Sequence, residues 1–141
     1  KYSVDRPMYK RLTELAGDKI LVSTASEDEW FDNMVELNWQ LYLCSSPPYL
    51  LQTKNDKRMH EYTKLAMAGQ VEEARVIRDS LDPVRQALKG TRPGGKPQAH
   101  QKYWQELLGQ VGGPVRAPLL QLTEEEKERT KEAFLNCGLK L

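Results

Sequence analysis

The sequence lacks any long apolar run, and it lacks a surplus of charge of either sign. A membrane-spanning helix needs roughly 20 consecutive apolar residues, whereas the apolar stretches of this 141-residue chain are only a few residues long. Lysine and arginine total 21, and aspartate and glutamate total 20. No overall field therefore attracts nucleic acid or an anionic lipid surface, and we expect neither nucleic acid nor a membrane as a partner.

Cysteine is scarce as well, and no secretory leader is visible. The two cysteines, Cys44 and Cys137, match neither a metal motif nor a disulfide framework, which is typical of a reducing compartment. His60 and His100 have no ligand-like companions, and we expect both on the surface or on a helix face. These absences predict a cytoplasmic protein that uses no metal. Because the chain opens on Lys1 rather than Met, we expect it to be the C-terminal part of a longer protein.

What the sequence does contain is a pattern of alternating strands and helices. Two short apolar runs, at 20–22 and 41–44, flank a helical pattern over 27–38, and another helical pattern over 7–16 precedes them. A helix between two buried runs is typical of a βαβ unit, in which a right-handed crossover joins parallel strands. Two parallel strands cannot close a sheet by themselves. The pattern therefore predicts an α/β fold with further strands elsewhere.

Capping residues support the two early helices. Asp5 ahead of Pro7 is a typical helix start, and Gly17 is a typical end. Ser26 and Glu29 match a capping box for the second helix. The first helix also carries three apolar residues at helical spacing, namely Met8, Leu12 and Leu15.

The rest of the chain is helical in pattern. We expect a long helix over 71–89, kinked by Pro83, because an internal proline removes a hydrogen bond and clashes with the preceding turn. A short helix follows over 99–108. Thr123 and Glu126 match a second capping box, which opens the last helix.

Hydroxyl side chains follow each of the two predicted strands. Ser23 and Thr24 come after the first strand, and Ser45 and Ser46 come after the second. In parallel α/β proteins the reactive groups sit just past the C-terminal ends of the strands. These hydroxyls are therefore candidate ligands for the carboxylate or hydroxyl of a substrate. The alternative is that they cap helices or bond to the loop backbone.

Lys1 would join this group if the strand–helix–strand repeat extends one step upstream. A lysine amine is normally protonated, but removing it from water disfavours the ammonium form and lowers its pKa toward roughly 7–8. The neutral amine can then attack a ketone carbon and form a Schiff base. The alternative is that Lys1 is merely a solvated chain end.

Several stretches resemble one known superfamily. Lys1 followed by Tyr-Ser-Val-Asp resembles the strand-six lysine motif of the dihydrodipicolinate synthase and N-acetylneuraminate lyase superfamily of class I aldolases. The stretch LAMAGQVEEARVIRDSLDPVRQAL is similar to its alanine-rich helix pair with an internal proline. RPGGKPQAHQKYWQELLG resembles its proline-containing segment before a short helix, and GGPVRAPLLQLTEEEKERTKEAFLNCGL is similar to its ending. The chain as a whole resembles the C-terminal half of a superfamily member.

The resemblance implies the C-terminal part of a (β/α)8 TIM barrel with additional C-terminal helices. Residues 1–50 would be the last strands and helices of the barrel, and residues 51–141 would be its final helix and a helical extension. The implied activity is that of a Schiff-base-forming lyase, whether aldolase, dehydratase or synthase, on pyruvate or another 2-oxo acid. The implied assembly is a homo-oligomer, either a tetramer or a dimer. Lys1 would form the imine with no cofactor. The pocket would be lined by the four hydroxyl residues Ser23, Thr24, Ser45 and Ser46.

The sequence departs from the superfamily pattern after the first predicted strand, where the usual Ser-Gly-Asp reads Ser23-Thr24-Ala25. This departure points to a divergent aldolase or dehydratase. Two alternatives stay open. One is a non-catalytic paralogue that binds a small molecule in the same pocket, and the other is a helical interaction module in which residues 50–141 supply the functional surface.

Overall fold

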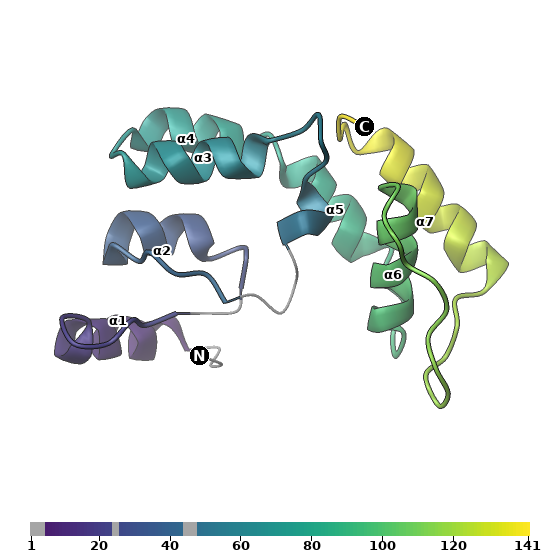
Figure 1. Cartoon of the computed structure of the whole chain (residues 1–141), viewed down its shortest axis with the longest axis horizontal. Helices are drawn as coiled ribbons and strands as arrows, with labels where there is room; N and C mark the ends of the chain where they lie inside the picture. The colour runs from purple at the N-terminus through teal and green to yellow at the C-terminus, as the bar shows by residue number, and fades with distance from the viewer. Residues whose placement is uncertain (1–4, 24–25, 44–47) are drawn as a thin grey trace. The chain divides into compact units, whose positions relative to one another are not determined.

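The computed structural model describes residues 5–23, 26–43 and 48–141, and the regular structure in these ranges is helical (Figure 1). The helices are α1 (Arg6–Ala16), α2 (Trp30–Leu37), η1 (Pro48–Leu51, a 3-10 helix), α3 (Arg58–Met67), α4 (Val71–Asp79), α5 (Asp82–Gly90), α6 (Pro97–Leu107) and α7 (Glu124–Asn136).

Backbone contacts divide the chain into two compact units. Unit 1 comprises Lys1–Pro48 and Arg58–Asp79, and unit 2 comprises Tyr49–Lys57 and Ser80–Leu141. The domain division that we predicted at residue 50 stays a prediction. In the part of the chain that is described, none of the helices has the length and apolar character of a membrane crossing.

The predicted α/β barrel portion is wrong, because the described residues form no β-strand. Residues 20–23 and 39–43, which contain the described part of both apolar runs, carry no regular structure. A strand of a parallel sheet is buried on both faces, whereas the Ile20 and Leu21 side chains are more than half exposed. A short apolar run bounded by turns fits several structures, and its periodicity alone does not select a strand.

In unit 1, α2 lies between α1 and the α3–α4 pair (Figure 1). The inward face of α1 packs on Trp39. The Tyr9 ring meets the Trp39 indole edge-on, with 5.8 Å between centroids, and the Trp39 indole N–H donates to the Thr13 hydroxyl at 3.0 Å. The buried residues of α2 include Trp30, Phe31 and Met34. Aromatic side chains therefore dominate the core of this unit.

The local signals for α1 and α2 were only partly right. The Asp5 carboxylate accepts from the Met8 N–H at 3.3 Å, so the predicted cap of α1 is confirmed. The predicted capping box of α2 is wrong, because α2 begins at Trp30 and Glu29 precedes it without a side-chain capping bond. The α2 helix ends at Asn38, whose φ of 54° is left-handed, a conformation that asparagine tolerates better than most residues.

The predicted long helix over 71–89 is instead two helices, α4 and α5, separated by Ser80 and Leu81. Pro83 lies in the first turn of α5, where its missing N–H costs no intrahelical hydrogen bond. One helix therefore ends before Pro83 and a second helix begins at Asp82, so that the expected kink is absent.

In unit 2, α7 packs against both α5 and α6. The fully buried Trp104 on α6 meets the Phe134 ring edge-on at 5.0 Å, and its indole N–H donates to the Leu50 carbonyl at 3.0 Å. The predicted capping box of α7 is confirmed. The Thr123 hydroxyl accepts from the Glu126 N–H at 3.2 Å, and the Glu126 carboxylate accepts from the Thr123 N–H at 2.7 Å.

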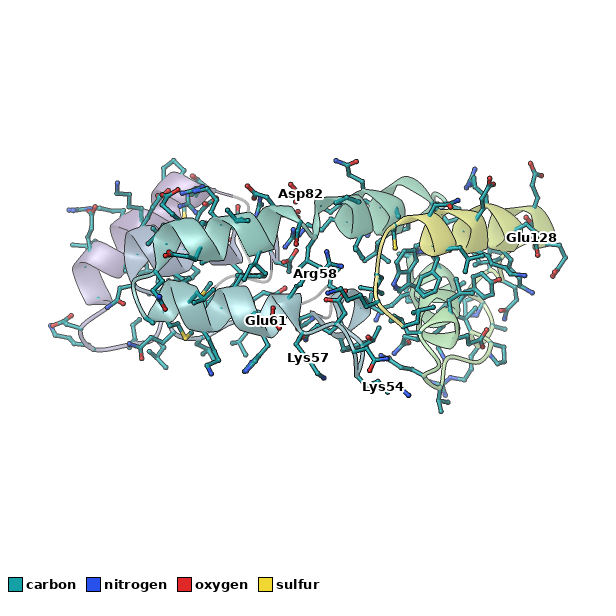
Figure 2. All side chains as sticks on the ribbon, turned by 90° about the horizontal axis from the view of Figure 1, so that it is seen from above. Lys54, Lys57, Arg58, Glu61, Asp82 and Glu128 are labelled. Atoms are coloured by element: carbon teal, nitrogen blue, oxygen red, sulfur yellow. The ribbon has the colours of Figure 1, made fainter. Side chains whose placement is uncertain are left out.

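Side chains of the segment 52–57 form hydrogen bonds with backbone atoms near the end of the sequence. The buried Asp56 carboxylate accepts from the Lys140 N–H at 3.1 Å, and the Thr53 hydroxyl donates to the Lys140 carbonyl. The Thr53 oxygen also accepts the Asp56 N–H, at 3.0 Å, which fixes the turn. Two exposed lysines, Lys54 and Lys57, belong to the same segment (Figure 2).

Candidate functional site

Ser23 is the predicted site residue that the structure allows us to place. Its hydroxyl donates to the Leu41 carbonyl at 2.9 Å and accepts from the Leu43 N–H at 3.2 Å. The side chain is buried. Ser23 therefore ties residues 20–23 to the segment 41–43. Two paired strands would be joined here by backbone hydrogen bonds, whereas this contact is made by a side chain.

The other predicted site residues, Lys1, Thr24, Ser45 and Ser46, lie outside the described residues. Their roles, and that of Ser23 toward a substrate, stay predictions. The residues on both sides of positions 24 and 25 are described.

A polar cluster joins Glu27 and Trp30 to α3. The Tyr62 hydroxyl of α3 donates to the Glu27 carboxylate at 3.1 Å, and both side chains are buried. The Trp30 indole N–H donates to the Thr63 hydroxyl at 3.3 Å. The Trp30 indole also stacks on the Tyr42 ring, with 5.4 Å between centroids. Glu27 is thus tied to α3, and Ser23 is tied to the segment 41–43.

The chemistry of the Glu27–Tyr62 pair is that of a proton donor beside a carboxylate, which is a combination used in acid–base catalysis. Tyr62 is fully buried, however, and Glu27 nearly so. A substrate needs access to a reacting group, and these two oxygen atoms already bond to each other. We therefore assign this pair a structural role, which is to tie residue 27 to α3 in the core of unit 1.

Glu27 was not predicted as a functional residue, because it lies inside the stretch from Ser26 to Glu29 that matched a helix capping box. The available signal was weak. Glu27 lies three residues before the aromatic pair Trp30-Phe31, and a buried carboxylate needs a hydrogen-bond donor. Tyr62 recurs at helical spacing with Met59 and Ala66, which marks it as a core residue, and its hydroxyl gave no separate signal.

The two histidines differ in environment. His60 is exposed on α3, as predicted. His100 lies on the helix α6, which the predicted surface or helix-face position allows, but its side chain is buried. Its Nε2 lies 2.9 Å from the Thr91 hydroxyl oxygen. Burial, with smaller contributions from Arg92 and Arg129, lowers the pKa of His100 from 6.5 to about 4. A neutral, hydrogen-bonded imidazole in a core is a structural group.

No cluster of three His, Cys, Asp or Glu side chains suited to a metal occurs among the described residues. The outer face of α7 has a shallow, open hollow lined mainly by charged side chains, including Glu128 (Figure 2). It is a solvated helix surface, without buried polar groups pointing into it.

Comparison with known proteins gives one partial match. A stretch of 83 residues is 32% identical to the 4-hydroxy-tetrahydrodipicolinate synthase of Halorhodospira halophila (strain DSM 244 / SL1). Part of the chain is similar to that synthase. The match covers 59% of this chain and 26% of the synthase, so it spans about a quarter of the length of that relative. No family model matches the chain, and no solved structure matches it.

Proposed function

We propose that the chain belongs to a lyase that forms a Schiff base with pyruvate or another 2-oxo acid. The observation that carries the proposal is the 32% identity over 83 residues to a 4-hydroxy-tetrahydrodipicolinate synthase. The superfamily resemblance around Lys1 supports the same chemistry. We further propose that the protein works in the cytoplasm without a cofactor, with a small 2-oxo acid as its substrate.

In this proposal the neutral Nζ of Lys1 attacks the ketone carbon of the 2-oxo acid, and loss of water leaves an imine. The protonated imine withdraws electrons from the adjacent carbon, so that a C–C or C–O bond there can form or break. Hydrolysis of the imine then returns the free amine and releases the product. Thr24, Ser45 and Ser46 would bind the substrate carboxylate or hydroxyl. Ser23, whose hydroxyl bonds to residues 41 and 43, would mainly tie its own segment to 41–43.

Reductive trapping tests the proposal. The full-length protein is incubated with pyruvate and borohydride, and its intact mass is measured together with a peptide map. We expect a gain of one reduced pyruvate adduct on the Nζ of Lys1, and no adduct at that residue in Lys1→Ala. The matched control is Lys10→Ala, which removes an exposed lysine of α1 and should trap normally.

The absence of an adduct with pyruvate and with a panel of other 2-oxo acids would count against the imine mechanism. Calorimetric binding of the same acids without trapping would favour the non-catalytic paralogue. An adduct that maps to other lysines, and persists in Lys1→Ala, would show nonspecific amine chemistry and would also contradict the proposal.

A further inference from the structure

Three side chains of one turn, residues 53–56, hold the tail of the sequence, residues 138–141 (Figure 1). The Thr53 hydroxyl donates to the Lys140 carbonyl, and the buried Asp56 carboxylate accepts from the Lys140 N–H at 3.1 Å. The Asn55 amide donates to the Leu141 carbonyl at 2.6 Å. All three bonds end on backbone atoms of the tail, so that they do not depend on the side chains of residues 140 and 141.

The turn is organised by bonds of its own. The Thr53 hydroxyl oxygen accepts from the N–H groups of Asn55 at 3.1 Å and of Asp56 at 3.0 Å. The Thr53 N–H donates to the Asp56 carbonyl at 3.2 Å. These bonds close within four residues and do not involve the tail. The turn is therefore a preformed receptor, and the tail is the part that can leave it.

The tail itself buries little. The side chains of Lys140 and Leu141 are exposed. Gly138 has a φ of 75°, a left-handed conformation that glycine adopts without strain and that is common where a helix ends. Just before it, the Cys137 N–H reaches the Phe134 carbonyl at 3.4 Å, which is a long hydrogen bond. Segments with few buried apolar contacts open at low cost, so we expect the end of α7 to depend on the turn.

A buried thiol lies where α7 meets the tail. The Cys137 side chain is only 5% exposed, and its Sγ donates to the Phe134 carbonyl at 3.0 Å. Two residues separate Cys137 from Lys140, whose N–H and carbonyl are both held by the turn. Because this connection is short, we expect outward movement of Cys137 to require release of Lys140.

We propose that the tail is a strap that leaves and rejoins the turn 53–56 as one local unit, while the rest of unit 2 stays folded. In the closed state, which the structure shows, the Cys137 thiol is shielded. In the open state the last turn of α7 unwinds and the thiol becomes accessible to soluble reagents. The Trp104–Phe134 contact in the core of unit 2 is not broken by this movement. The proposal does not rest on the proposed lyase activity.

Alkylation of the full chain by dilute iodoacetamide, mapped to Cys137 by peptide mass, tests the proposal. We expect a rate at least about tenfold below that of the urea-unfolded chain. Thr53→Val and Asn55→Ala should each raise the rate about fivefold, the factor that corresponds to one hydrogen bond. Lys140→Pro removes the N–H that the buried Asp56 carboxylate accepts, and should raise the rate about tenfold or more. The matched control is Lys140→Ala, which keeps this N–H and should react like the wild type.

A second control separates local opening from global unfolding. Thr123→Ala destabilises α7 at its other end and leaves the turn and the tail intact. A thiol that is reached through the strap should not respond to this variant, and its rate should stay nearly constant in dilute urea, because local opening exposes little surface. Circular dichroism shows that each variant is folded.

Three results would overturn the proposal. The first is that Thr53→Val, Asn55→Ala and Lys140→Pro all react at the wild-type rate. The second is that Thr123→Ala or Lys140→Ala accelerates alkylation as much as those variants do. The third is a wild-type rate that equals the rate of the unfolded chain, since the closed strap would then shield nothing.

Discussion

Lowering the pH from 7 toward 4 is expected to destabilise unit 2 through His100. The Thr91 hydroxyl donates its proton to the Ala87 carbonyl at 2.8 Å, so its oxygen must accept from Nε2–H of His100. This bond is available to the neutral imidazole with its proton on Nε2. A second proton on the ring would place a full charge in the core of unit 2, next to Trp104.

The magnitude follows from the pKa values of the two states. Burial, followed by Arg92 and Arg129, lowers the pKa of His100 from 6.5 to about 4 in the folded chain. Above pH 6.5 both states carry a neutral imidazole, and the full stability is present. As the pH falls below 6.5 the unfolded chain takes up a proton that the folded chain refuses, so stability is lost until the pH reaches the folded value. This linkage amounts to about 2 kcal/mol by pH 5 and about 3 kcal/mol by pH 4.

Urea unfolding between pH 4 and 8, followed by circular dichroism, measures this loss. Carboxylates also titrate in that range, so the comparison is with His100→Gln, whose amide can still donate to Thr91 but does not titrate. The variant should be less stable at pH 7 and should lack the part of the pH dependence assigned to His100. His60→Gln, at the exposed histidine of α3, is the control and should keep the wild-type profile. An unchanged profile in His100→Gln would refute the reasoning.

Three further predictions concern single contacts. Arg6 donates to the carbonyl oxygen of the buried Asn33 amide, whose nitrogen has no hydrogen-bond partner among the described residues. Arg6→Ala should cost about 1–3 kcal/mol in urea unfolding, but much less in an Asn33→Leu background, where no buried amide remains. Thr123→Ala removes the N-cap of α7 and should lower the free energy of unfolding by about 1 kcal/mol in the same assay, because the capping box is lost. Thr53→Val should speed hydrogen exchange of the Lys140 amide roughly fivefold, because the hydroxyl that holds its carbonyl is gone; unchanged exchange would show that the hydroxyl does not hold the tail.

Local signals predicted those features of the fold that depend on local chemistry. The caps at Asp5 and Thr123 were predicted correctly, since a side-chain oxygen near a helix start has few other backbone donors to meet. The predicted kink at Pro83 was wrong, because a new helix begins there. A proline is incompatible with a helix interior, but the sequence does not say whether the chain kinks or restarts there.

Features that depend on distant partners could not be predicted. The run 20–22 is apolar enough for a buried strand, yet a strand exists only where another backbone pairs with it. Here the described contact between 20–23 and 41–43 passes through the hydroxyl of Ser23. Ser23 was recognised as a place for function, but the buried pair nearby in the sequence, Glu27 and Tyr62, joins positions that are 35 residues apart. No pattern of spacing connects two such positions.

The first helix shows why spacing alone is insufficient to assign a core. Met8, Leu12 and Leu15 have the same spacing as Tyr9, Thr13 and Ala16, and hydrophobicity alone would select the first set for burial. The structure buries Tyr9 instead, because its ring and the Thr13 hydroxyl together satisfy both the face and the N–H of the Trp39 indole, which leucines could not do. A polar requirement of the core therefore decides which face of α1 turns inward.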